Sequence, residues 1–384
     1  MSDQLARLRL ARTSGVGPIL YRRLMARFGT AEAALAAIPD IASSHGRADP
    51  VRIPSLAEAR SEIDAVAGLG GRMLYLGLPG YPALLATMAD APPVLSVLGD
   101  PALLSLPCVA MVGSRNASAN GRQLAAAIAA DLARAGIAVV SGLARGIDGA
   151  CHRAALLQGA TIACIAGGLD RPYPEEHTLL QQEIGQRGVV IAEAPLGTTP
   201  QARHFPRRNR LIAGLSLGVV VIEAALRSGS LITARIALEE NRLLFAAPGS
   251  PLDPRCRGSN GLLREGAVLV ESADDVTAAL PSFSREAAKG AGPLFARETQ
   301  DEAPALAPHV TPQIVAAVAS LLGPSPAAVD DLAAHCQFSP PEIRSALLDL
   351  ELAGRVQALP GDQFALIAAP PHARNLADAR LRPA

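Results

Sequence analysis

Residues 109–142 read VAMVGSRNASANGRQLAAAIAADLARAGIAVVSG, which has the pattern of a strand, a helix and a second strand. The outer segments, 109–113 and 137–142, are short apolar runs that end in small residues, whereas GRQLAAAIAADLARAG between them is typical of a helix. Strand–helix–strand order of this kind predicts two parallel strands joined by a crossover helix.

The same alternation continues toward the C-terminus, with helical stretches such as GIDGACHRAALLQG between the apolar runs. Because most of the runs are continuously apolar, helices should cover both faces of the sheet, and the chain is predicted to contain a doubly wound, mostly parallel α/β sheet. The further strand candidates are TIACIAGG (161–168), VVIAEA (189–194), GVVVIEA (218–224), LLFAAPG (243–249) and AVLVES (267–272).

A helical domain is predicted over residues 1–69, ahead of a sheet domain over 70–280. Residues 14–18, SGVGP, lie between two helical patterns and look like the turn of a helix-hairpin-helix. Residues 1–30 hold six arginines against Asp3. The turn therefore either holds a phosphate through its backbone N–H groups or is only a tight connection.

A small module is predicted after a linker at 281–309, which is rich in Ala, Pro and Gly. Residues 310–370 have the pattern of three helices and a two-stranded hairpin, a winged helix, and residues 371–384 form a tail. Two arginines oppose six acidic residues in 310–368, a net charge of −4, and the third helix is itself acidic. Phosphates would repel that helix, so a protein-binding or self-association role is expected.

Composition excludes several classes of function. The 384 residues hold 35 basic and 35 acidic side chains, and Lys289 is the only lysine. A P-loop is therefore absent, and a catalytic lysine is not expected. The five cysteines form no CxxC pair, which indicates reduced thiols without a metal, and no signal peptide or apolar membrane span is visible. These features predict a cytoplasmic protein.

Small polar residues and arginines follow several of the predicted strands. The carboxyl ends of parallel strands meet at one edge of the sheet, where ligands bind. Several such turns in register favour an extended anionic ligand, and since no GxGxxG follows the first strand, no dinucleotide cofactor is predicted. The candidate residues at these turns are Ser114, Arg115, Gly142, Arg145, Ser228, Gly229 and Ser230.

The most basic stretch, residues 203–210, lies between the fourth and fifth predicted strands and holds four arginines and no acidic residue. Residues 195–264 hold ten arginines against four acidic residues. Arginines bind phosphates whatever the base sequence, and Phe205 offers a plane for stacking a base, so single-stranded nucleic acid is the favoured ligand. The alternative is a solvated basic loop, which would leave Phe205 exposed without a role. The candidates are His204, Phe205, Arg207, Arg208, Asn209 and Arg210.

Acidic residues and a histidine raise a different possibility. Glu193 and Glu223 also end strands, while Asp148 and His152 are four residues apart on one helix. They suggest a hydrolytic pair or half a metal site, but no third metal ligand can be placed. The structural interpretation is favoured: Glu223 as partner of a groove arginine and His152 as a packing residue.

Several long motifs resemble the DNA-processing protein A family (DprA, also called Smf). They include VAMVGSRNAS, VVSGLARGIDGACHRAAL, TIACIAGGLDRPYP, FPRRNRLIAGLS and VVVIEAALRSGSLITARIALEENR, in that order. The resemblance implies an extended Rossmann-like domain that binds single-stranded DNA, between an N-terminal helical domain (SAM-like or helix-hairpin-helix-like) and a winged helix. It also implies a homodimer that helps load the RecA recombinase during natural transformation and recombination, and no catalytic residue or cofactor.

Two competing classes remain. The same Rossmann variant resembles nucleotide phosphoribohydrolases, which cut an N-glycosidic bond with a strand-end glutamate. Their Pro-Gly-Gly-x-Gly-Thr turn is missing here, where residues 228–233 read SGSLIT. The other class is an adaptor that meets proteins only, which would leave the basic stretch unexplained.

Overall fold

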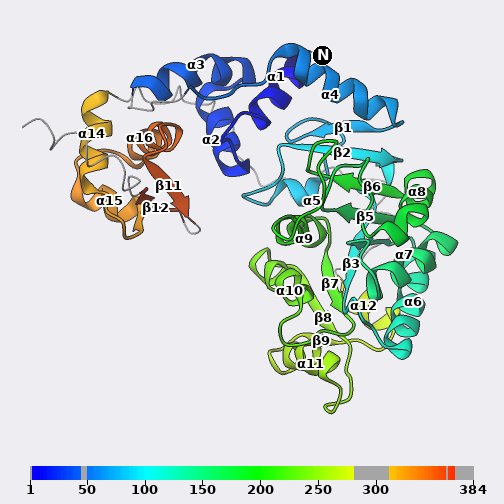
Figure 1. Cartoon of the computed structure of the whole chain (residues 1–384). Coiled ribbons are helices and arrows are strands. Elements are labelled where there is room, and N and C mark those ends of the chain that lie inside the picture. Colours follow the sequence, from blue (N-terminus) through cyan, green and yellow to red (C-terminus); the bar gives the residue numbers. More distant parts are fainter. Residues whose placement is uncertain (1, 45–49, 281–310, 360–361, 368–384) are drawn as a thin grey trace, which may run out of the picture. The chain divides into compact units, whose positions relative to one another are not determined.

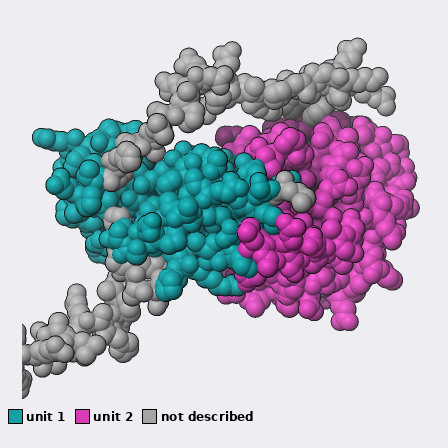
Figure 2. All heavy atoms as spheres, turned by 90° about the horizontal axis from the view of Figure 1, so that it is seen from above, with its two compact units in different colours: residues 1–55, 297–384 teal, residues 56–296 magenta. Residues whose placement is uncertain are grey.

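The chain forms two compact units in this computed structural model (Figures 1 and 2), which describes residues 2–44, 50–280, 311–359 and 362–367. One unit is Leu56–Ala296, and the other joins Met1–Ser55 with Arg297–Ala384. The N-terminal helices and the winged helix, predicted as separate domains, therefore belong to one unit. The predicted linker (281–309) and tail (371–384) lie outside the described residues.

The sheet of the unit Leu56–Ala296 (unit 2 in Figure 2) has nine strands in the described part of the chain, in the order β1-β2-β6-β5-β4-β3-β7-β8-β9. Strands β3 to β9 are parallel, whereas β1 pairs antiparallel with β2, and β2 with β6. The strands are β1 (Arg72–Tyr75), β2 (Val94–Gly99), β3 (Cys108–Val112), β4 (Ala138–Ser141), β5 (Thr161–Ile165), β6 (Val189–Ala192), β7 (Gly218–Val221), β8 (Leu243–Ala246) and β9 (Val268–Leu269). All seven predicted strands are confirmed, and the antiparallel pair β1–β2 is an addition.

Helices cover both faces of this sheet, as the apolar strands predicted (Figure 1). Alternate residues of β3 enter different cores: Ala110 joins the cluster with Leu211 of α9, and Met111 joins the cluster with Ile128 of α6. The helices of this unit are α4 (Leu56–Gly68), α5 (Ala83–Ala86), α6 (Ala119–Arg134), α7 (Ile147–Gln158), α8 (Thr178–Arg187), α9 (His204–Gly214), α10 (Gly229–Glu239), α11 (Arg257–Arg264) and α12 (Ala273–Ala279), with short 3₁₀ turns at Pro101–Ser105, Glu175–His177 and Pro254–Cys256.

The strand order places a topological switch point beside β3. From β3 the chain steps through β4 and β5 to β6 on one side, then returns through α9 to β7 on the other. The connections after β3 and β7 therefore diverge, which leaves a crevice at the carboxyl ends of these strands.

The other unit (unit 1 in Figure 2) contains the N-terminal helices and the winged helix. Two separate apolar clusters hold it together, one inside the winged helix and one among α1–α3 that also includes Leu348 and Leu352 of α16. Its elements are α1 (Ser2–Ala11), α2 (Pro18–Phe28), α3 (Ala31–Ser44), α14 (Pro312–Leu321), β10 (Ala327–Ala328), α15 (Val329–His335), α16 (Pro340–Leu352), β11 (Val356–Leu359) and β12 (Gln363–Leu366). The three helices and hairpin predicted for the winged helix are present.

The residues between α1 and α2 form the predicted turn. Gly15 has a φ of +84°, and Pro18 is the first residue of α2. The Ser14 N–H donates to the Arg52 carbonyl at 3.0 Å, and the Val16 N–H to the Thr13 carbonyl at 3.0 Å. These two N–H groups are satisfied internally, which favours the tight connection over phosphate binding.

Membrane insertion through a helix is not seen: among the described residues, each helix is too short or too polar to span a bilayer.

His152 of α7 is a buried packing residue, in agreement with the sequence interpretation. Its side chain is fully buried, and the Thr161 hydroxyl donates to the Val139 carbonyl at 2.8 Å. The His152 Nδ1–H therefore donates to Thr161 Oγ1, 2.7 Å away. Burial lowers the pKa of His152 to about 3, and the nearby His177 and Arg208 act in the same direction.

We predict that this histidine makes the protein acid-sensitive. The ordinary pKa of 6.5 applies to the unfolded chain, so between pH 6.5 and about 3 only the unfolded state binds the proton. The stability that the neutral His152 side chain contributes is fully present above pH 6.5. It is lost as the pH falls, at about 1.4 kcal/mol of unfolding free energy per pH unit. His152→Gln should flatten the free energy of unfolding between pH 6 and pH 4, measured by urea denaturation. His335→Gln, at an exposed histidine of α15, should keep the wild-type slope, and an equal slope in both variants would contradict the prediction.

Candidate nucleic-acid interface

An open groove of about 810 Å³ lies at the switch point, at the carboxyl ends of β3, β4 and β7. Its walls are the turns that follow these strands and the first turns of α9 and α10. A narrower slot continues from it toward the end of β5, and the two share Arg115, Ala144, Tyr173, Pro200 and Phe205.

Most of the residues predicted from the sequence meet in this groove and slot. They come from the turns after β3, β4 and β7 and from α9, so the strand-end argument correctly predicted that these segments meet. These residues are Ser114, Arg115, Gly142, Arg145, Phe205, Arg208, Asn209, Ser228, Gly229 and Ser230.

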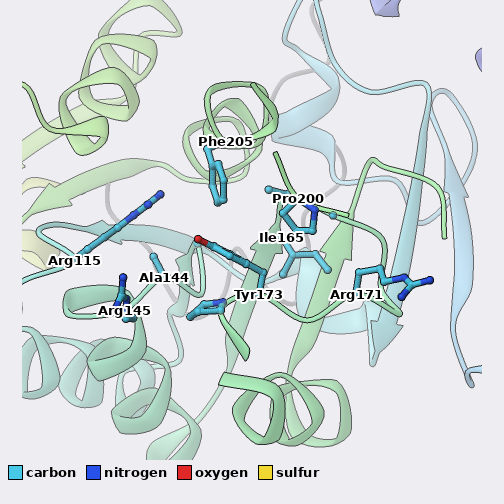
Figure 3. Close-up of a pocket in the computed structure, with 12 residues that line it drawn as sticks. Arg115, Ala144, Arg145, Ile165, Arg171, Tyr173, Pro200 and Phe205 are labelled. Atoms are coloured by element: carbon cyan, nitrogen blue, oxygen red, sulfur yellow. The ribbon is translucent and has the colours of Figure 1, made fainter. Parts of the chain in front are cut away.

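An arginine and two aromatic rings form the centre of the slot (Figure 3). The ring centroids of Tyr173 and Phe205 are 5.5 Å apart with the planes tilted by 58°, and the Arg115 guanidinium lies 5.0 Å from the Phe205 ring centroid. Tyr173 is 47% exposed, and Arg145 is exposed at the rim. The arrangement offers a partly exposed aromatic surface beside two cationic side chains.

Tyr173 was missed by the sequence analysis. It lies in the loop after β5, inside the motif GGLDRPYP, but it is eight residues beyond the strand. The signal that could have identified Tyr173 is the rarity of its residue type, because the chain has only four tyrosines. The number of residues between a strand and a side chain does not reveal whether the loop between them folds back over the strand ends.

Arg208 is enclosed rather than open to the groove. The residue is 5% exposed, and its Nη1 donates to the Cys164 carbonyl of β5 at 2.8 Å. Asp148 is also buried; burial raises its pKa, while the nearby Arg208 and two N–H donors lower it. The charge of Arg208 is therefore balanced inside the protein by Asp148.

The turn after β4 is shaped around this arginine. The Gly142 and Ala144 N–H groups donate to Asp148 Oδ2 at 3.1 and 3.3 Å. These two N–H groups are thus engaged by Asp148 and are not free to donate to a ligand in the groove. A Cβ on Gly142 would lie 1.8 Å from Arg208 Nη1, so the absence of a side chain is what this position supplies.

Arg207, Arg210 and His204 do not line the groove. Arg207 and Arg210 both pair with Glu193, at 2.7 and 2.6 Å, and the Arg210 side chain is only 8% exposed. The prediction that Arg210 lies in the groove is wrong, because Glu193 holds it inside the protein. His204 is the first residue of α9, and its Nδ1 accepts the N–H of Gln201 at 3.3 Å. The alternative of a solvated basic loop is wrong as well, since these residues begin a helix.

The other strand-end glutamate also has a structural partner. Glu223 accepts the Ser118 N–H at 2.9 Å and the Ser118 hydroxyl, at the N-cap of α6. The sequence suggested Glu223 as the partner of a groove arginine, and this interpretation is wrong because Glu223 is bound to Ser118. Glu193 and Glu223 therefore both have structural partners within the protein.

Polar residues on the far wall fix the turn that begins α10. The Ser230 hydroxyl donates to the Gly113 carbonyl at 2.9 Å, and Asn209 Nδ2 donates to the Gly229 carbonyl at 3.3 Å. Ser228 Oγ accepts the Ser230 N–H at 3.2 Å as N-cap. These bonds link α9, β3 and α10, and they place the positive end of the α10 dipole at the groove, where it favours an anion.

We predict opposite outcomes for two glycines of this site. Gly142→Ala should lower the free energy of unfolding by about 1–3 kcal/mol, because the new methyl group must displace the buried Arg208. Gly229→Ala is the matched control, since nothing lies within 4 Å of its would-be Cβ and alanine favours a helix start. Urea denaturation measures both, and an equal loss in the two variants would refute the packing argument.

Comparison with known proteins places this chain in a family. A family model described as DNA recombination-mediator protein A matches residues 72–281. Models of a DprA-like N-terminal HHH domain and a DprA winged helix domain match residues 1–65 and 301–362.

Individual relatives agree with these matches. Protein Smf of Escherichia coli is 40% identical over 286 residues, which cover 73% of this chain and 74% of that protein. DNA processing protein DprA of Streptococcus pneumoniae is 48% identical over 199 residues, or 52% of this chain and 70% of that protein. The X-ray structure of DNA processing protein A from Streptococcus pneumoniae aligns with a TM-score of 0.60 at 36% identity, covering 73% of this chain and 99% of that chain. The chain therefore belongs to the DNA recombination-mediator protein A family, as its ordered motifs predicted.

Proposed function

We propose that this protein binds single-stranded DNA in the groove beside β3. The observation that carries the proposal is the cluster of Arg115, Phe205 and Tyr173, in which an exposed guanidinium and two partly exposed rings meet at the groove. Aromatic faces hold successive bases by stacking, and nearby arginines hold the backbone that joins them.

The geometry favours a single strand over a duplex. Stacking on Phe205 or Tyr173 requires bases that are not paired with a complementary strand. The third helix of the winged helix, α16, is acidic and would not enter a major groove. The proposed contacts involve arginine and aromatic side chains, so affinity should depend little on base sequence.

The family suggests what the bound strand is for. The matching family model is described as a recombination mediator, and the relatives are named for DNA processing. We propose that the protein acts in the cytoplasm as a homodimer and presents single-stranded DNA to the RecA recombinase during DNA uptake and recombination.

We also propose that the protein has no glycosidase activity. Glu193 is bound by two arginines and Glu223 by Ser118, which removes the glutamates that a phosphoribohydrolase mechanism needs. The test is incubation with AMP or CMP followed by chromatography for free base, in which release above a protein-free control would reject this part of the proposal.

Salt dependence should identify the phosphate contacts. If Arg115 neutralises one phosphate, Arg115→Ala should make the slope of log K against log salt shallower by about 0.7 for a single strand. Arg134→Ala is the control, at an exposed arginine on α6 that pairs with Asp131. Fluorescence anisotropy with a labelled oligonucleotide measures the slope for both variants. Equal slopes for Arg115→Ala and wild type would mean that Arg115 does not contact a DNA phosphate.

Stacking should account for a separate part of the affinity. Phe205→Ala should weaken binding by about 5- to 150-fold, the equivalent of one stacked base, without altering the salt slope. Tyr173→Phe keeps the ring and should bind single-stranded DNA as tightly as wild type. Tyr173→Ala removes the ring and should bind more weakly. Equal affinity of all three variants at one salt concentration would mean that the rings do not touch bases.

A further inference from the structure

Two opposite charge imbalances occur in one compact unit. Residues 1–30 carry a net charge of +5, and residues 310–368 carry −4. The described parts of both segments belong to the unit that joins Met1–Ser55 with Arg297–Ala384. The acidic winged helix therefore has a basic partner within its own chain.

Arginines of α2 meet the acidic residues of α16 directly. Arg27 forms an ion pair with Asp349, whose side chain is only 5% exposed, and it also donates to the Ser345 carbonyl at 3.4 Å. Arg23 pairs with Glu351 at 3.2 Å and lies 4.8 Å from the Phe364 ring centroid. Because Arg23 and Arg27 are four residues apart, both lie on one face of α2.

Apolar side chains continue the same contact. Leu348 and Leu352 of α16 are 2% and 4% exposed, and they belong to the buried cluster that contains Leu20 and Leu24 of α2. Leu347 and Leu350, in contrast, belong to the core of the winged helix. The third helix thus has two apolar faces, one for its own module and one for the N-terminal helices.

Periodicity along the third helix does not separate these two faces. By spacing alone, Leu347, Leu350 and Leu352 could each belong to the core of the module or to a partner surface. Leu347 and Leu350 are core, whereas Leu352 packs into the buried cluster formed by α1, α2 and α3.

We propose that α2 is a built-in ligand of α16, and that this clasp occupies the face through which a winged helix reads a major groove. The occupant is defined by its chemistry: an amphipathic helix that carries two buried leucines, Leu20 and Leu24, and two arginines spaced i, i+4, Arg23 and Arg27. While the clasp is closed, α16 is unavailable to duplex DNA and to any other protein. This goes beyond DNA binding in the groove, since it assigns a partner to each terminal domain.

The test uses the full chain with a protease site inserted within residues 281–309. After cleavage, the winged helix remains with residues 1–280 only if the clasp holds it. Size-exclusion chromatography at about 0.05 M salt should show the two fragments eluting together, and about 1 M salt should weaken the association because the ion pairs are screened.

Charge reversal makes the test specific. Arg27→Glu should weaken the association of the fragments at least tenfold, and adding Asp349→Arg should restore it, because the pair is then re-formed with exchanged signs. Arg355→Glu is the control, at an exposed arginine of the same module, and should leave the fragments together. Circular dichroism before cleavage verifies that each variant is folded.

The proposal is overturned if the wild-type fragments separate at low salt. It is also overturned if folded Arg27→Glu stays associated as tightly as wild type, or if the exchanged pair fails to restore what Arg27→Glu loses. Binding of single-stranded DNA by residues 1–280 is recorded in parallel, so that a failure of the clasp is distinguishable from a failure of the DNA groove.

Discussion

The bond from Arg208 to the Cys164 carbonyl determines where α9 lies, and the groove depends on α9. The guanidinium passes beside Gly142 at the end of β4 and reaches β5, while Asp148 balances its charge from α7. The strand β5, the turn after β4 and the start of α7 are thereby fixed to α9. Phe205, at the start of that helix, is held at the opening of the slot as a result.

The arginines of the basic stretch divide into two functions that their sequence does not distinguish. Arg208 and Arg210 are buried and neutralised by carboxylates, so they position α9. Arg115 and Arg145, which come from other turns, provide the accessible positive charge. A helix that carries buried cations needs buried anions opposite it, which Glu193, after β6, and Asp148, in α7, provide.

The strands could be predicted because burial on both faces leaves a continuous apolar run, which β3 to β8 show with little ambiguity. The short antiparallel strand β1 has only two buried residues and gave no such signal. Proximity at the strand ends was also predictable, since parallel strands share one edge. Which arginine is buried, where Tyr173 folds back and what covers α16 depend on tertiary contacts between distant segments, and local patterns carry no information about these.

The contact between α2 and α16 also concerns the order in which the chain is synthesised. Leu20 and Leu24 leave the ribosome more than 300 residues before Leu348 and Leu352, the residues that complete their buried cluster. At roughly 5–20 residues per second, that interval lasts tens of seconds. Throughout it the first helices have an unfilled apolar face and two unpaired arginines, while the sheet domain is already being made. The helices α1–α3 are therefore translated long before the segment that completes their final packing.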